Sequence, residues 1–109
     1  LPVSMLSGPC RRSASATAGS WVAPADRVTA IEAAFAALAH QVPGIVDLEW
    51  GTNVSPEGLD QGFTHCFLVT FEDAAARDAY LPHPAHVAFG ALLQPHLERV
   101  LVIDYAARH

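Results

Sequence analysis

Apolar residues recur with a helical period after residue 24. Between Pro24 and Pro43, large apolar side chains follow one another at three- and four-residue steps, as on one face of an amphipathic helix. These positions are Val28, Ile31, Phe35, Leu38 and Val42. Pro24 suits a first helical turn, and Pro43-Gly44 predicts the end of the helix.

The next two segments predict strands separated by a surface loop. Residues 45–50 alternate, with Val46, Leu48 and Trp50 on one side of a half-buried strand. Residues 51–62 are polar and rich in turn formers, as in a loop. Residues 63–71 are the strongest strand, and both of its faces are largely apolar, so we expect protein to cover both.

A divided helical region and a last strand follow. Residues 73–80 predict a short helix, which Leu81-Pro82-His83-Pro84 interrupts. His83 is expected to cap the next helix, with Pro84 at its first position. Residues 100–105 predict a closing strand whose branched core is typical of a strand covered on both faces.

These elements predict an α+β domain. One strand before Pro24 would complete the order βαββαβ, the ferredoxin-like plan with helices on one face of an antiparallel sheet. The other sheet face would then be apolar and bare. A second copy of the chain would cover that face, so we expect a homodimer, as in a dimeric α/β barrel.

Residues 1–23 look unlike the rest, and we predict an irregular segment there, with the domain at 24–109. Residues 13–20 are all small, and the segment carries Arg11 and Arg12 but no acid. Such a composition can mark an organelle transit peptide. A loose leader or a misplaced chain start is the simpler interpretation.

Composition narrows the class of protein. The chain has 109 residues, which fits one domain, and 51% of them are apolar, which excludes disorder over most of it. No apolar run approaches the roughly 20 residues of a membrane helix. The net charge of −5 argues against nucleic acid as a partner. Two cysteines, Cys10 and Cys66, make no disulfide framework and favour a reducing compartment, the cytoplasm.

Three side chains suggest acid–base chemistry in one cavity. His65 points from a strand face toward the predicted helices, which carry Tyr80 and His86. An imidazole takes a proton near pH 7, and a tyrosine hydroxyl can bind an enolate oxygen, which suits proton abstraction next to a carbonyl. Spacing alone favours a structural alternative, in which His65 is a satisfied core histidine, Tyr80 a plug and His83 a cap.

Other chemistries find less support. A metal would need His65, His83 and His86 to converge, and the proline between the last two weakens this. Cys66 lies mid-strand without a nearby base, so we do not expect a reactive thiol. We therefore predict no metal and no cofactor.

Several ordered segments resemble the stress-responsive dimeric α/β-barrel (Dabb) family. They are Gly62-Phe63-Thr64-His65, Val69-Thr70-Phe71-Glu72, Asp78-Ala79-Tyr80, His83-Pro84-Ala85-His86-Val87-Ala88-Phe89-Gly90 and Val102-Ile103-Asp104-Tyr105. The resemblance implies a ferredoxin-like dimer. It covers residues 24–109. The N-terminal residues depart from the family pattern, in which the first strand would fall at about residues 11–19. Residues 1–6 and 19–22 are alternative places for this strand.

The resemblance also implies roles for individual residues. Compared with a plant polyketide cyclase of the family, which closes poly-β-ketones by aldol condensation without cofactor or metal, His86 would be the base. Tyr80 would stabilise the enolate oxygen, and His65 would line the pocket. We add Phe67 and Phe89 as contacts for a small hydrophobic or polyketide-like ligand. A non-enzymatic stress or ligand-binding protein and an oxygenase-like or haem-binding relative stay open as alternatives.

Overall fold

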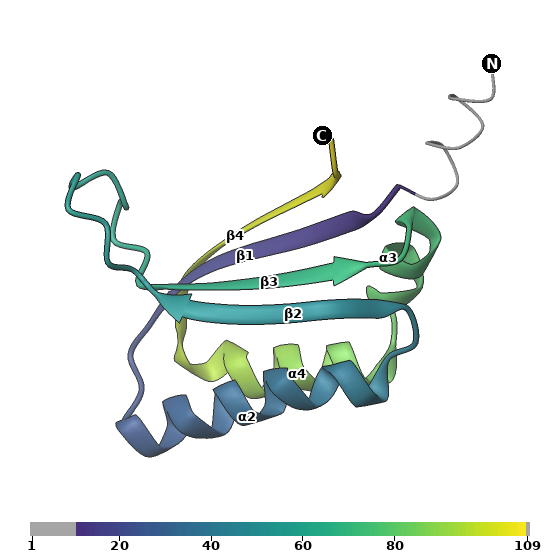
Figure 1. The fold of residues 1–109 in the computed structure, drawn as a ribbon. Helices are drawn as coiled ribbons and strands as arrows, with labels where there is room; N and C mark the ends of the chain where they lie inside the picture. Colours follow the sequence, from purple (N-terminus) through teal and green to yellow (C-terminus); the bar gives the residue numbers. More distant parts are fainter. Residues whose placement is uncertain (1–10, 109) are drawn as a thin grey trace.

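Four antiparallel strands form one sheet, and the helices cover one of its faces (Figure 1). The structure, a computed structural model, describes residues 11–108. Its elements are β1 (Ser13–Trp21), α2 (Ala25–Gln41), β2 (Ile45–Thr52), β3 (His65–Phe71), α3 (Ala74–Tyr80), α4 (Pro84–Leu93), the 3₁₀ turn η1 (Gln94–His96) and β4 (Leu97–Ala106). The strand order is β2-β3-β1-β4. The predicted α+β, ferredoxin-like fold is confirmed.

The first strand lies inside the segment that we predicted to be irregular, and it overlaps residues 11–19, where the family resemblance would place it. β1 is central and pairs with β3 on one side and β4 on the other, with Thr17 opposite both Phe67 and Val102. Small residues suit this place because their neighbours in the sheet are large, and two ladders of backbone hydrogen bonds outweigh poor strand propensity. Residues 1–6, an alternative place for this strand, lie outside the described residues.

The core forms between α2 and β3. Ile31, Phe35 and Leu38 are each only 1% exposed, which confirms the apolar face predicted for this helix. Phe67 and Phe71 of β3 are buried against them. Apolar burial on this scale is the main force holding the helix layer on the sheet.

β2 contains an irregularity that the alternating pattern does not reveal. The register with β3 shifts between Ile45 and Asp47, so that two residues of β2 stand opposite Phe71. As a result Ile45 packs against the core together with Leu48, whereas Val46 is 40% exposed. The prediction that Val46 lies on the buried side is wrong because a β-bulge reverses the alternation at that point.

Side-chain caps fix the two short helices. The Asp73 carboxylate accepts a hydrogen bond from the Ala76 amide at 2.9 Å and starts α3. The Nδ1 atom of His83 accepts one from the Ala85 amide at 3.0 Å and starts α4, with Pro84 at the first position. The predicted capping role of His83 is therefore confirmed, and it sets the direction in which α4 leaves α3.

The sheet face away from the helices is open. From the pairing registers this open face carries Ala16, Ala18, Cys66, Leu68, Leu101 and Ile103. Leu101 and Ile103 are about half exposed, so the chain's own helices do not supply the cover that was expected over this second face of β3 and β4. Within residues 11–108, no helix has the length and apolarity needed to cross a membrane.

Candidate functional site

A cavity of about 270 Å³ lies between the sheet and the α3–α4 region. Its walls are mainly apolar, and a few polar groups converge in it. The residues used below are Ser15, Thr17, Phe67, Tyr80, His86 and Phe89. A concave apolar site with few polar groups is the usual form of a small-molecule site, and this volume is near the lower limit for one.

Three phenylalanines form the apolar wall. Phe35 of α2 lies 4.6 Å from Phe67 of β3 and 5.6 Å from Phe89 of α4, measured between ring centroids. Phe67 and Phe89 meet edge to face at 6.0 Å. The structure thus brings two of the predicted ligand-contacting residues, Phe67 and Phe89, into the same cavity as Tyr80 and His86.

Tyr80 ends α3 and is almost fully buried. Its ring lies 5.0 Å from that of Phe71 and 4.1 Å from that of His86. Burial, and secondarily the negative charge of Asp104, raise the pKa of Tyr80 to about 12. The hydroxyl therefore stays protonated at neutral pH and can donate a hydrogen bond to an oxygen that gains negative charge.

A backbone hydrogen bond fixes the orientation of His86. Its Nδ1 atom lies 2.9 Å from the Leu81 carbonyl oxygen. A carbonyl can only accept, so Nδ1 carries the proton. In the neutral ring the Nε2 atom is then the unprotonated nitrogen and is available as a base. The interruption between α3 and α4 at Leu81-Pro82 thus supplies the carbonyl that selects the tautomer.

His65 does not line this cavity. Its ring stacks on the indole of Trp21, with centroids 4.1 Å apart, and its Nδ1 atom lies 2.8 Å from the Thr64 hydroxyl. It lines a different hollow, at the end of the sheet where β2 and β3 meet the loop that joins them. Partial burial lowers the pKa of His65, and Glu32 of α2 opposes this shift. The expectation that His65 shares one cavity with Tyr80 and His86 is corrected, because His65 stacks on Trp21 and is not among the residues that line the cavity.

Sequence reasoning missed Trp21, which stands at the end of the segment predicted to be irregular. The indole also lies 5.6 Å from the Phe67 ring. A Cβ built on Gly19 would come within 2.9 Å of the indole, so the glycine makes room for it on the sheet. The available signal was a glycine two residues before a tryptophan, just ahead of a helix.

The described residues offer no metal centre. Among residues 11–108, no three side chains of His, Cys, Asp or Glu lie close enough together to hold an ion. Cys66 is exposed on the open face, away from His86. The chemistry that the cavity can perform thus rests on one imidazole and one neutral phenol, supported by the hydroxyls of Ser15 and Thr17.

The sequence matches a known domain family over most of its length. A family model described as the stress responsive A/B barrel domain (Dabb) matches residues 22–107. The chain belongs to this Dabb family. The match includes β2, β3 and β4 and all the helices described above, so the family resemblance inferred from the sequence is confirmed.

Two curated proteins illustrate what the Dabb chain is similar to. The stress-response A/B barrel domain-containing protein HS1 of Arabidopsis thaliana is 37% identical over 98 residues, which are 90% of this chain and 89% of HS1. Olivetolic acid cyclase of Cannabis sativa is 37% identical over 71 residues, which are 65% of this chain and 70% of the cyclase. One relative is thus named for stress response and the other for catalysis.

A solved structure supports the fold and bears on assembly. A dimeric ferredoxin-like protein of unknown function from Jannaschia sp. CCS1 superposes with a TM-score of 0.76 at 28% identity. The match covers 86% of this chain and 97% of that protein. Proteins of this fold and similar length therefore include dimers.

Proposed function

We propose that this Dabb chain is a homodimeric, cofactor-independent enzyme that catalyses an aldol-type cyclisation of a small poly-β-keto substrate. The observation that carries the proposal is the hydrogen bond from His86 Nδ1 to the Leu81 carbonyl. It leaves Nε2 as a base beside a tyrosine that remains protonated. The similarity to olivetolic acid cyclase over 65% of the chain supports the same chemistry.

The proposed reaction uses only these two side chains. His86 Nε2 takes a proton from a carbon between two carbonyls, and the Tyr80 hydroxyl donates a hydrogen bond to the enolate oxygen that forms. The enolate carbon attacks a second carbonyl carbon of the same chain, forming the ring bond. The resulting alkoxide then takes back the proton from the His86 imidazolium. No oxidant or reductant enters the balance.

The cavity supports a small, largely apolar substrate. Phe35, Phe67 and Phe89 offer apolar contact for an alkyl tail, while Ser15 and Thr17 offer hydroxyls for carbonyl oxygens. A volume of about 270 Å³ favours a folded chain over a long extended one. Positioning the reacting carbons within such a cavity supplies part of the rate enhancement.

The open face supports the homodimer. Leu101 and Ile103 of β4 would lose their contact with water against a second sheet, which is the usual way to bury an apolar sheet face. The dimeric relative at 28% identity agrees with this assembly. Native mass spectrometry of the purified chain tests it, with a twofold mass as the expected result.

The catalytic proposal is tested with a linear tetra-β-keto thioester. Without an enzyme such chains close through oxygen to a pyrone, so the ratio of carbon-ring product to pyrone, measured by liquid chromatography and mass spectrometry, reports on the enzyme. We expect the wild type to favour the carbon ring. Tyr80→Phe should lower the ratio of carbon-ring product to pyrone at least tenfold, and His86→Ala should give only pyrone. An unchanged product ratio in His86→Ala would exclude the proposed base.

A non-enzymatic role in binding small apolar ligands is the second candidate. The specific observation in its favour is the phenylalanine wall, which serves binding without any chemistry. This role predicts that ligand affinity depends on Phe67 and Phe89 and is unaffected by His86→Ala. Carbon-ring product from the wild-type protein would exclude binding as its whole function.

A further inference from the structure

The loop between β2 and β3 is an arm that its own hydrogen bonds hold together. We define the arm as residues 53–63; it stands away from the helices, on the side of the open face (Figure 1). Within it, the Asn53 side chain donates to the Asp60 carboxylate at 2.7 Å, and the Gly62 amide donates to the same carboxylate at 2.9 Å. Such order costs conformational entropy that a free loop would keep.

A clamp from β4 holds the base of the arm. The Arg99 guanidinium donates a hydrogen bond to the Gln61 carbonyl and lies 4.6 Å from the centre of the Phe63 ring. Gln61 itself has a positive φ of 57°, a backbone conformation that non-glycine residues adopt only when their surroundings impose it. The arm is therefore held in one direction, although its apolar residues Val54 and Leu59 remain 90% and 74% exposed.

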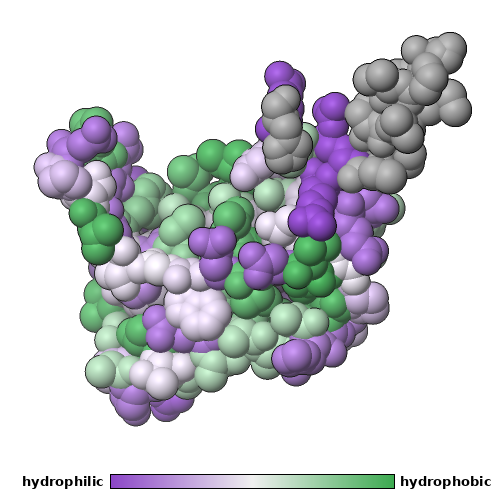
Figure 2. Space-filling view, viewed as in Figure 1, coloured by the Kyte–Doolittle hydropathy of each residue, from purple (hydrophilic) through white to green (hydrophobic). Residues whose placement is uncertain are grey.

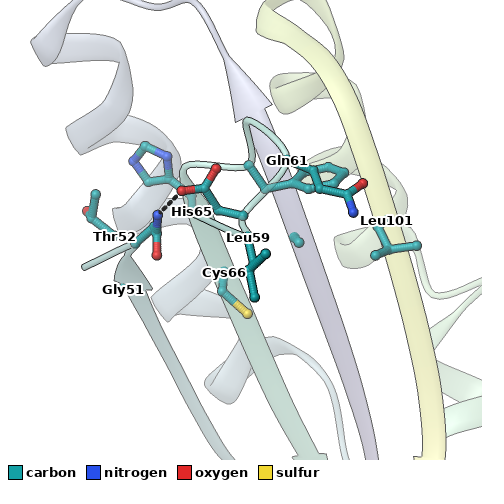
Figure 3. Close-up of a pocket in the computed structure, with 11 residues that line it drawn as sticks. Gly51, Thr52, Leu59, Gln61, His65, Cys66 and Leu101 are labelled. Carbon is teal, nitrogen blue, oxygen red and sulfur yellow. Dashed lines mark hydrogen bonds between the residues drawn. The ribbon is translucent and has the colours of Figure 1, made fainter. Parts of the chain in front are cut away.

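A hollow of about 520 Å³ lies between the arm and the open face. Figure 3 shows Leu59 of the arm close to Cys66 of β3, with Leu101 of β4 on the far side of the hollow. In the space-filling view, apolar atoms lie between the raised arm and the end of β4 (Figure 2). A second sheet laid on the open face would enter this space and meet the underside of the arm.

The arm has an excess of acids and the opposite end of the sheet an excess of arginines. Each end also holds a residue of the other sign, Arg99 at the base of the arm and Glu72 next to Phe71, the partner of Ser13. The arm carries two acids, Glu57 and Asp60, and no basic residue. At the other end of the sheet lie Arg11, Arg12 and Arg108, which we call the basic end. They come together because β1 begins where β4 ends, with Ser13 opposite Ala106. Strands of this length separate the two ends by roughly 27 Å.

We propose that the arm is a clasp that closes over the basic end of a second copy of the chain. This inference rests on the homodimer proposed above and adds how its subunits are oriented. If both arms stood at the same end of the dimer, their acids would face each other. If the strands of the two sheets run in opposite directions, each arm meets the partner's basic end, and the two contacts are related by the two-fold axis.

The distribution of polar residues on the open face fits this arrangement. Asp47 and Glu49 of β2 stand opposite Thr70 and Leu68 and so belong to the same face, at its margin. The apolar part is confined to β1, β3 and β4, where the partner sheet would be centred. Leu59 then gains apolar contact from the partner, which offsets the cost of ordering the arm.

Charge reversal tests the clasp. We expect Glu57→Arg and Arg108→Glu each to raise the dimer dissociation constant about tenfold in sedimentation equilibrium at low salt, because each change occurs twice in the dimer. The double variant should return to within about threefold of the wild type. Arg27→Glu, a reversal on α2 in the helix layer, is the matched control and should leave the constant unchanged.

A covalent readout separates the clasp from the dimer itself. In a Cys10→Ser/Cys66→Ser background, Glu57→Cys combined with Arg108→Cys should give a disulfide-linked dimer on a non-reducing gel, whereas each single variant should not. A wild-type dimer without this cross-link, and without any response to charge reversal, would overturn the clasp and keep the homodimer. A wild-type monomer would overturn both.

Discussion

The indole ring of Trp21 stacks on the imidazole of His65 at a centroid distance of 4.1 Å, and the same indole lies 5.6 Å from the ring of Phe67. Phe67 lines the cavity that holds Tyr80 and His86, whereas His65 lines the hollow beneath the arm. The buried indole packs closely over Gly19 and holds the His65 ring by stacking. The two histidines therefore belong to different environments.

This separation predicts different effects for two matched substitutions. His86→Gln should lower turnover of a poly-β-keto substrate by about 10²–10⁴-fold, the usual contribution of a positioned acid–base group. His65→Gln should keep turnover within about threefold of the wild type, because its ring does not reach the cavity. Steady-state kinetics with both variants measures this contrast.

The folded state of both variants should be checked by circular dichroism at the assay temperature. Similar spectra would show that neither glutamine disturbs the sheet. A His65→Gln enzyme as inactive as His86→Gln would contradict the separation and would place His65 in the catalytic machinery.

The buried phenol of Tyr80 contributes stability to the fold that is lost at alkaline pH. Burial and the charge of Asp104 raise the pKa of Tyr80 to about 12, above the value of about 10 in an unfolded chain. The neutral phenol therefore stabilises the fold fully below pH 10, and this contribution is lost as the pH rises from 10 through 12. We expect urea unfolding to show this decline in the wild type and a smaller one in Tyr80→Phe.

Tyr105→Phe is the matched control, because Tyr105 is 46% exposed on β4. Its stability should fall with pH in the same way as that of the wild type. If Tyr80→Phe and the wild type lost stability in parallel between pH 10 and 12, the buried phenol would not be the group responsible.

Local patterns were enough to predict most of the fold. The three- and four-residue spacing of Ile31, Phe35 and Leu38 identified the buried face of α2, because helical geometry alone places those residues together. Proline after a histidine identified the start of α4, where His83 caps the helix. These signals depend on residues close together in the sequence, so they can be recognised without knowledge of the tertiary structure.

The first strand and the position of His65 depend on contacts that sequence neighbours do not reveal. β1 is built of small residues, and its strand conformation comes from pairing with β3 and β4, which lie about 50 and 85 residues later in the chain. His65 was correctly placed on the helix-facing side of β3, but the side chain on which it stacks, Trp21, comes from β1. Both the strand conformation of β1 and the surroundings of His65 depend on how β1 pairs with β3 and β4.

Gly19 predicts a large effect from one methyl group. Alanine there would bring its Cβ within 2.9 Å of the Trp21 ring, which is packed and cannot move freely. We expect Gly19→Ala to lower the free energy of unfolding by about 1–3 kcal/mol, as overpacking in a core usually does. Urea denaturation at one fixed protein concentration measures it, since a dimer's stability depends on concentration.

Gly51→Ala is the matched control for this substitution. Gly51 also lies in a strand, β2, but a Cβ built there has no atom within 4 Å. The change should alter the free energy of unfolding by no more than about 0.5 kcal/mol, as at an unconstrained site. Equal losses in the two variants would show that strand glycines in general, and not the Trp21 contact, set the cost.

The tautomer of His86 can be observed directly. Because Nδ1 donates to the Leu81 carbonyl, neutral His86 should carry its proton on Nδ1, whereas His83, whose Nδ1 accepts from the Ala85 amide, should carry it on Nε2. Long-range ¹H–¹⁵N correlation spectra at pH 8, where imidazoles are mainly neutral, distinguish the two forms. We expect opposite patterns for the two rings in one spectrum, with His86→Ala and His83→Asn assigning the signals. An Nε2–H pattern for His86 would mean that the Nδ1 hydrogen bond to the Leu81 carbonyl does not form, and that the nitrogen proposed as the base already carries the proton.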